Sequence, residues 1–196
     1  MLADDAVGVM EKNAAGKLAM TKVTLRQVYD ALGEAWPEAS RASLIVLTAQ
    51  IGIECADGQR VHNYNLGNVK RIPGQPWTML PKVWEILRSV PAGASSFTAR
   101  PDGLFRVVFD PPHPQTHFRA FSTLEQGTAE HLSTLRKRFA AAWPSVEAGD
   151  PAAFGRRLKA LRYYTAPEAD YVRALELRAA RLEAEVPPRA RDVYGE

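Results

Sequence analysis

Residues 42–54 read ASLIVLTAQIGIE, and nearly every position is apolar or small. A helix that is apolar on all sides lies inside a core rather than on a surface. We therefore expect a buried central helix here, with Ser40 as its N-cap. The helix is expected to end at Glu54, because Asp57-Gly58 marks a turn just beyond it. The stretch predicts a fold built around one buried helix with a carboxylate at its end.

The segments around this helix are also mostly helical. Capping-box patterns and first-position prolines predict further helices over residues 24–36, 81–90, 122–143, 150–161 and 165–182, with capping boxes that begin at Thr24, Ser122 and Thr165. One β-hairpin is expected, with strands 104–109 and 117–121. The predicted fold class is α+β, predominantly α. We expect a loose arm over residues 1–20, one domain over 21–186 and a frayed tail over 187–196.

Composition excludes several classes of protein. The chain has 196 residues, of which 46% are hydrophobic and 24% charged, as in ordinary globular proteins. Its longest strongly apolar run, residues 44–47, is far shorter than a membrane-spanning helix requires. The 25 Lys and Arg exceed the 22 Asp and Glu only slightly, which suits an anionic polymer as partner without demanding one. Cys55 is the single cysteine, so no internal disulfide can form.

Glu54 is the strongest candidate for chemistry. Apolar surroundings disfavour its charged form, and the negative end of the helix dipole does the same. Both effects raise the pKa of the carboxyl group. Cleavage of a glycosidic bond needs a carboxylic acid that is still protonated near neutral pH, because the leaving oxygen must receive a proton. The alternative is a solvent-facing glutamate at a helix end.

A polar loop follows this helix, with the sequence NYNLGNVK over residues 63–70. Asparagine amides offer a donor and an acceptor together, which suits sugar hydroxyls and acetamido groups. Tyr64 offers a face for a sugar ring, and Gly67 allows backbone to approach a ligand closely. The alternative is an Asn-Gly turn that only connects two elements.

A buried helix ending in glutamate and followed by this loop resembles the lysozyme-like peptidoglycan hydrolases. The resemblance is to glucosaminidase domains of the flagellar-muramidase type (mannosyl-glycoprotein endo-beta-N-acetylglucosaminidase-like) and to related phage and bacterial muralytic enzymes. Segments 118–127, 149–154 and 163–167, with Tyr171 beyond, match the family in the same order. The resemblance implies a lysozyme-like fold with the hairpin beside the cleft. It also implies a hydrolase that cleaves the β-1,4 glycan of peptidoglycan.

The resemblance also implies roles for individual residues. Glu54 matches the catalytic general acid, and Tyr163 matches a tyrosine that lines the cleft near the reacting sugar. The implied substrate-binding residues are Asn63, Tyr64, Asn65, Gly67, Asn68, Tyr164 and Tyr171. The chain departs from the family at Cys55-Ala56-Asp57, where glycines are common, at Leu66 in place of phenylalanine, and at Ala166 in place of aspartate.

A second catalytic carboxylate is left open. Most glycosidases use two, and the candidates are Glu85 and Asp57, followed by Asp102 and Asp110. The substrate's own acetamido oxygen could instead attack the anomeric carbon, which is the substrate-assisted exception. Attack by the muramyl 6-hydroxyl would give an anhydro product, as in lytic transglycosylases. The sequence leaves muramidase and N-acetylglucosaminidase specificity equally open.

Other chemistries have less support. The four histidines show no metal-ligand spacing, so we expect neither a metal nor another cofactor. Cys55 could be a thiol nucleophile, although a small buried residue is the simpler interpretation. One rival function is a non-catalytic glycan-binding or structural component of a phage tail or secretion device. The other is a basic, helical nucleic-acid-binding protein.

The predicted partner is the peptidoglycan strand, with no nucleic acid and no membrane insertion, and we expect a monomer. The first residues, Met1-Leu2-Ala3-Asp4-Asp5, lack the basic and apolar regions of a signal peptide. We therefore expect a bacteriolytic, endolysin-like enzyme that is made in the cytoplasm. It would reach the cell wall through a holin, a virion or a secretion apparatus and degrade it there.

Overall fold

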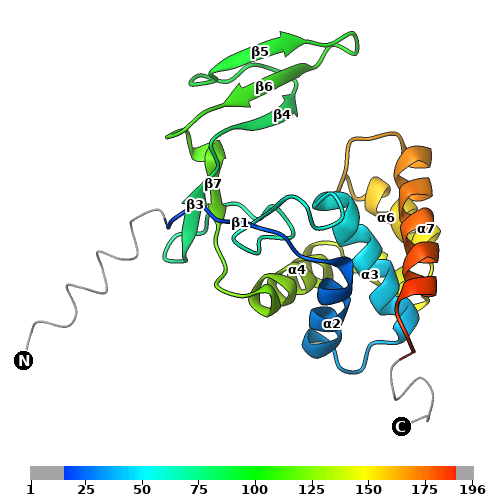
Figure 1. Cartoon of the computed structure of the whole chain (residues 1–196). Helices are drawn as coiled ribbons and strands as arrows, with labels where there is room; N and C mark the ends of the chain where they lie inside the picture. The colour runs from blue at the N-terminus through cyan, green and yellow to red at the C-terminus, as the bar shows by residue number, and fades with distance from the viewer. Residues whose placement is uncertain (1–15, 189–196) are drawn as a thin grey trace, which may run out of the picture. The chain divides into compact units, whose positions relative to one another are not determined.

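The computed structural model describes residues 16–188, which form two compact units (Figure 1). Residues 20–67 and 122–188 form a helical unit, and residues 16–19 together with 68–121 form a sheet unit. The predicted single domain over residues 21–186 stays a prediction. Most of the predicted arm over residues 1–20 and of the tail over 187–196 lies outside the described residues.

The helical unit contains six α-helices, one short 3-10 helix and one pair of two-residue strands in the described residues. These are β1 (Met20–Thr21), α2 (Leu25–Ala35), α3 (Arg41–Glu54), β2 (Val61–His62), α4 (Leu124–Arg138), η2 (Ala140–Ala142), α5 (Trp143–Glu147), α6 (Pro151–Ala160) and α7 (Glu168–Glu185). Helix α3 packs against α2, α5 and α7, and α4 packs against α2 (Figure 1).

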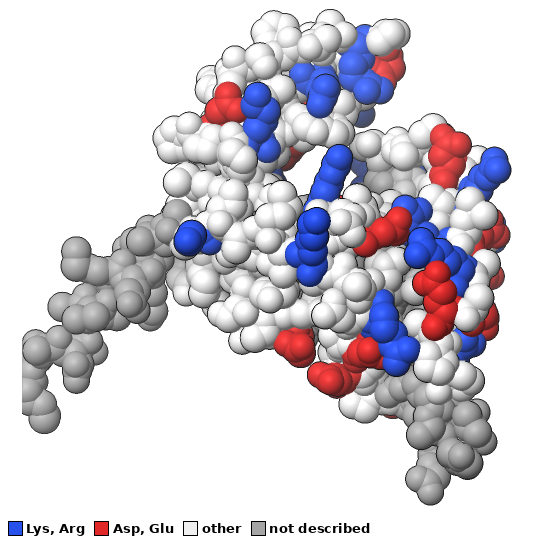
Figure 2. Space-filling model, viewed as in Figure 1, with Lys and Arg blue, Asp and Glu red and all other residues white. Residues whose placement is uncertain are grey.

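The sheet unit contains six short elements. These are β3 (Trp77–Met79), β4 (Val83–Leu87), β5 (Ser96–Ala99), β6 (Phe105–Phe109), the 3-10 helix η1 (Pro114–Thr116) and β7 (His117–Arg119). Strands β4, β6 and β5 form an antiparallel sheet in that order, and β3 pairs with β7 in a separate two-stranded sheet. The charges of this region are mainly basic, as the blue atoms in Figure 2 show.

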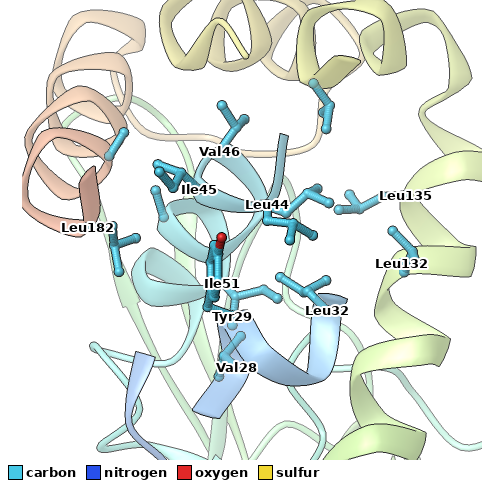
Figure 3. Packing of buried hydrophobic residues seen from close by; sticks show 14 of the residues in the cluster. Val28, Tyr29, Leu32, Leu44, Ile45, Val46, Ile51, Leu132, Leu135 and Leu182 are labelled. Carbon is cyan, nitrogen blue, oxygen red and sulfur yellow. The ribbon is translucent and has the colours of Figure 1, made fainter. Parts of the chain in front are cut away.

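The core of the helical unit is formed around α3, as its composition predicts. Leu44 and Ile51 are fully buried among hydrophobic residues of the neighbouring helices (Figure 3). Leu47 is also fully buried, and even Thr48 and Gln50 have no exposed surface. The buried Thr48 hydroxyl donates to the Leu44 carbonyl within the helix, so this polar group is satisfied without water. The predicted buried central helix is therefore confirmed, including its N-cap at Ser40 and its end at Glu54.

Local signals place several other helices correctly. The Thr24 side chain accepts from the Gln27 amide, and the Gln27 side chain accepts in return from the Thr24 amide. Asp150 caps α6, with Pro151 at its first position. The cap of α4 lies one residue later than predicted, because Thr123 rather than Ser122 accepts from the backbone amide of Gln126; the Gln126 side chain accepts from the backbone amide of Ser122 rather than from that of the N-cap residue.

Four sequence predictions about elements are wrong. The helix predicted over residues 81–90 is strand β4, because pairing with β6 outweighs a weak local helix signal. The segment 117–121 does not pair with β6, since β4 and β5 occupy both edges of that strand. The helix predicted to continue to residue 143 ends at Arg138, and a separate helix, α5, begins at Trp143. Thr165 does not cap α7, because Pro167 disfavours helical geometry at the preceding residue.

The predominantly α, α+β prediction is confirmed, but the β part is larger than one hairpin. Within residues 16–188, no helix is long and apolar enough to cross a membrane.

Candidate active site

Glu54 is the last residue of α3 and is partly buried at the surface of the helical unit. The Tyr171 hydroxyl, from α7, donates to Glu54 Oε1 at 3.2 Å. Gln50 Nε2, one turn earlier in α3, donates to the same oxygen at 3.2 Å. The Tyr163 hydroxyl forms a further hydrogen bond with the carboxyl group. Three neutral donors therefore surround one carboxyl group.

Burial raises the pKa of Glu54, and it outweighs the hydrogen bonds from Tyr171, Gln50 and Tyr163, which lower the pKa. The predicted direction of the shift is therefore confirmed, and its main cause is desolvation. The three donors have a second consequence. They stabilise the carboxylate that remains after Glu54 has given up its proton. Because these groups already donate to the carboxyl group, the acid's own proton is free to point toward a ligand.

Gln50 connects the carboxyl group to the interior of the unit. Its Nε2 also donates to the Tyr163 hydroxyl at 2.8 Å, and its Oε1 lies 2.8 Å from His131 Nε2. Since Gln50 Oε1 can only accept, His131 must carry its proton on Nε2. Burial lowers the pKa of His131 to about 4, so the ring is neutral at ordinary pH. His131 thus fixes the orientation of the Gln50 amide.

The two neighbouring tyrosines are held by ring contacts. Tyr164 stacks on Tyr171 with centroids 3.7 Å apart, and the Tyr164 hydroxyl donates to the Gly155 carbonyl. Tyr163 meets Phe139 edge to face at 4.9 Å. Burial raises the pKa of both Tyr163 and Tyr171, so both hydroxyls remain protonated donors. The structure therefore brings Tyr163 and Tyr171 to Glu54 and places Tyr164 behind Tyr171.

The loop after α3 is held against α4. A Cβ atom at Gly127 would collide with the Tyr64 carbonyl, so the loop backbone lies directly on the helix there. A side chain at Gly67 would collide with His131 Nδ1 in the same way. The neighbour that Gly67 approaches closely is thus His131. Asn63 and Tyr64 adopt left-handed backbone conformations, which asparagine tolerates better than most residues.

The predicted loop residues differ in their exposure. Asn65 is buried, with 6% of its surface exposed. Tyr64 lines a surface pocket of about 400 Å³ with residues of β1, α2 and the start of α4. Neither Glu54 nor Tyr163 lines that pocket. Asn68 belongs to the sheet unit and is exposed. The substrate-binding roles of these residues stay predictions.

Two of the four candidates for a second carboxylate, Asp57 and Glu85, have ion-pair partners. Asp57 accepts two hydrogen bonds from the Arg178 guanidinium, at 2.7 and 3.2 Å, which joins the turn after α3 to α7. Glu85 accepts from Lys70 Nζ at 3.0 Å within the sheet unit. Asp57 therefore has a structural role in the pairing of α3 with α7.

Thiol and metal chemistry have no support at this site. Burial raises the pKa of the Cys55 thiol to about 11, and its Sγ accepts from the Gly58 amide at 3.2 Å. A thiol of this kind is a small core residue rather than a nucleophile. Within residues 16–188, no three His, Cys, Asp or Glu side chains come together as metal ligands would.

Sequence reasoning missed Gln50 and His131. Gln50 had a signal, because it is a polar residue four positions before Glu54 in an otherwise apolar stretch, and such positions share a helix face. His131 had none, since its contact with Gln50 joins residues 81 positions apart.

Comparison with known proteins places the fold. No family model matches the chain, and no curated protein matches its sequence. Among solved structures, the glycoside hydrolase domain of FlgJ from Salmonella typhimurium is similar, with a TM-score of 0.52 and 19% sequence identity. The match covers 82% of this chain and 87% of that domain. The chain has the lysozyme-like α+β fold of a glycoside hydrolase domain.

Proposed function

We propose that this protein is a glycoside hydrolase that cleaves the β-1,4 glycan of peptidoglycan, with Glu54 as its general acid. The observation that carries the proposal is the raised pKa of Glu54 at the end of a buried helix. A carboxyl group of that kind remains protonated at a pH where an exposed glutamate has lost its proton. The similarity to a glycoside hydrolase domain supports the same reaction class.

In the proposed mechanism, the Glu54 proton passes to the glycosidic oxygen while the bond to the anomeric carbon breaks. An oxocarbenium-like state then develops on the sugar. The Tyr171 hydroxyl and the Gln50 amide stabilise the new Glu54 carboxylate with bonds that are already in place. Tyr163 also hydrogen-bonds the carboxyl group and acts with Gln50 to hold it in position.

No residue of the chain is assigned as the nucleophile that attacks the anomeric carbon. Asp57 is paired with Arg178, and Glu85 is paired with Lys70. A substrate acetamido oxygen or a 6-hydroxyl could supply this step without a second carboxylate. We propose the cell wall as the place of action, because that is where the substrate lies.

The test is digestion of purified peptidoglycan by the wild type and by Glu54→Gln, with mass spectrometry of the soluble products. Glutamine preserves the shape of the side chain and a hydrogen-bonding group, but its amide has no acidic proton to transfer to the leaving oxygen. We expect fragments from the wild type and a loss of about 10²–10⁴-fold in the variant. The ends of the fragments distinguish a glucosaminidase, a muramidase and a transglycosylase. Equal lysis by the two proteins, or sacculus binding without fragments from either, would refute the proposal.

A further inference from the structure

The sheet unit carries the positive charge of the chain. Residues 68–121 contain seven Lys or Arg and three Asp or Glu, a net charge of +4. The whole chain has a net charge of +3, so all other residues together carry −1. In Figure 2, blue atoms outnumber red ones over the strands β4, β5 and β6. Any electrostatic attraction for an anionic partner is therefore centred on the sheet unit.

The three-stranded sheet β4-β6-β5 has two unlike faces. Residues that are paired across antiparallel strands point to the same side. One side carries Val107 and Phe109, which are fully buried. We call the other side the open face, and its strand positions are Trp84, Ile86, Ser96, Thr98, Arg106 and Val108. None of these positions is buried, and none is acidic.

Trp84 and Arg106 are the distinctive pair on the open face. Trp84 is 55% exposed, although tryptophan is usually highly buried. The Arg106 guanidinium lies over its ring, with Cζ 4.8 Å from the ring centroid. Within residues 16–188 the structure gives Arg106 no carboxylate partner, whereas Arg100 pairs with Asp102. An exposed indole beside an unpaired guanidinium is an arrangement typical of a binding surface.

Further cations extend the open face at both ends of β4. Lys82 and Arg88 are exposed and flank the strand, two positions before Trp84 and two positions after Ile86. The nearest acidic residue on β4, Glu85, points to the opposite side and is engaged by Lys70. The open face therefore offers one aromatic ring, small hydroxyls and the Arg106 guanidinium, with further basic residues just beyond both ends of β4.

We propose that the open face binds an acidic glycan strand, as a contact in addition to the proposed reaction at Glu54. The indole ring would stack on the apolar face of a sugar, and Arg106 would bind a carboxylate on the strand. Ser96 and Thr98 would hydrogen-bond sugar hydroxyls. The assignment of this strand as peptidoglycan rests on the proposed function. A single ring and a net charge of +4 fit a glycan better than a nucleic acid, which draws its affinity from many phosphate contacts.

The test measures binding of the full chain to purified sacculi at fixed ionic strength. All variants carry Glu54→Gln, so that cleavage does not remove the ligand. We expect Trp84→Ala and Arg106→Ala each to weaken binding about tenfold, which corresponds to about 1.4 kcal/mol. The matched aromatic control is Phe97→Ala, because Phe97 is 58% exposed on the other side of the same sheet. The charge control is Lys137→Ala on the helical unit. Both controls are expected to bind within twofold of the parent.

The ligand's charge is tested with sacculi whose carboxylates have been amidated. On these, Arg106→Ala should lose its effect while Trp84→Ala keeps it. Equal losses in the two control variants, or no loss in Trp84→Ala, would overturn the proposal. Tighter binding to duplex DNA than to sacculi, weakened by the same two substitutions, would replace the glycan with a nucleic acid.

The outcome separates this inference from the proposed function. If the wild type releases glycan fragments but Trp84→Ala binds normally, only the second contact is wrong. If the wild type releases none but Trp84→Ala and Arg106→Ala lose binding, the proposed cleavage is wrong and the binding surface stands.

Discussion

The helical unit and the sheet unit differ in how far their side chains are buried. In the helical unit, α3 buries nearly all of its side chains, including the polar Thr48 and Gln50. In the sheet unit, β5 has no buried residue, and β4 exposes a tryptophan. The first arrangement holds one carboxyl group in a raised-pKa environment. The second presents cations and an aromatic ring to solvent. The proposed catalytic acid therefore lies in the unit with buried side chains, and the proposed glycan-binding surface lies in the unit with exposed ones.

The largest effect should come from the core of the helical unit. Leu47 is fully buried in α3, so Leu47→Ala would leave a cavity. We expect a cost of about 2–5 kcal/mol in the free energy of unfolding. Trp84→Ala on the open face should cost no more than about 0.5 kcal/mol. Urea denaturation of both variants measures the difference. Similar losses would show that the sheet is as tightly packed as the helical core.

A second prediction concerns how the helical unit tunes Glu54. His131→Phe removes the donor that holds Gln50, and the Gln50 bond to Glu54 lowers the pKa of that carboxyl group. The pKa should rise in the variant, so activity should persist to higher pH. The basic limb of the profile of kcat/KM against pH reports this shift. His131→Gln, which keeps a donor, is the control. A limb that does not move in His131→Phe would refute the positioning role.

A third prediction links the same carboxyl group to stability. Folding raises the pKa of Glu54, so between its unfolded and folded pKa values the folded state binds more protons. Stability should therefore fall as pH rises through that window. The glutamine side chain of Glu54→Gln does not titrate. The Tm of the variant minus that of the wild type should therefore rise as pH increases. Calorimetry across this range measures the difference. A difference in Tm that is constant with pH would contradict the assigned shift.

The smallest effect is expected at the Asp57–Arg178 pair. Asp57 is 40% exposed and Arg178 27% exposed, so solvent screens their attraction. A double-mutant cycle with Asp57→Asn and Arg178→Ala should give a coupling of about 0.5–1 kcal/mol. Activity should stay within a few-fold of the wild type. A loss of activity as large as that of Glu54→Gln would instead assign Asp57 as the second catalytic carboxylate.

The sequence predicts those elements whose structure depends on interactions between residues close together in the chain. The buried α3 and the capping box at Thr24 depend on residues within one or two turns, and both are confirmed. Strand β4 depends on pairing with β6, about twenty residues away, and the local pattern favoured a helix instead. Local signals were sufficient only where local interactions determine the structure.

The same reasoning applies to the candidate site. The position and pKa direction of Glu54 follow from its own helix, so the sequence could predict them. The structure places the Tyr163 and Tyr171 side chains at Glu54, and the roles toward a sugar that the resemblance implied for them stay predictions. The His131–Gln50 bond depends on the packing of α4 against the rest of the unit, which no local pattern encodes. The open face was also missed, because its alternation becomes visible only once β4 is known to be a strand.

The central claim is that Glu54 donates a proton to the leaving oxygen. The most direct measurement compares wild type and Glu54→Gln on two N-acetylglucosamine oligomers, one with its natural sugar leaving group and one with a dinitrophenyl leaving group. A dinitrophenolate departs without protonation, so it needs no general acid. We predict a loss of about 10²–10⁴-fold on the natural linkage and a much smaller loss on the dinitrophenyl glycoside. Equal losses on both substrates, or no loss on the natural linkage, would contradict the assignment of Glu54 as the acid.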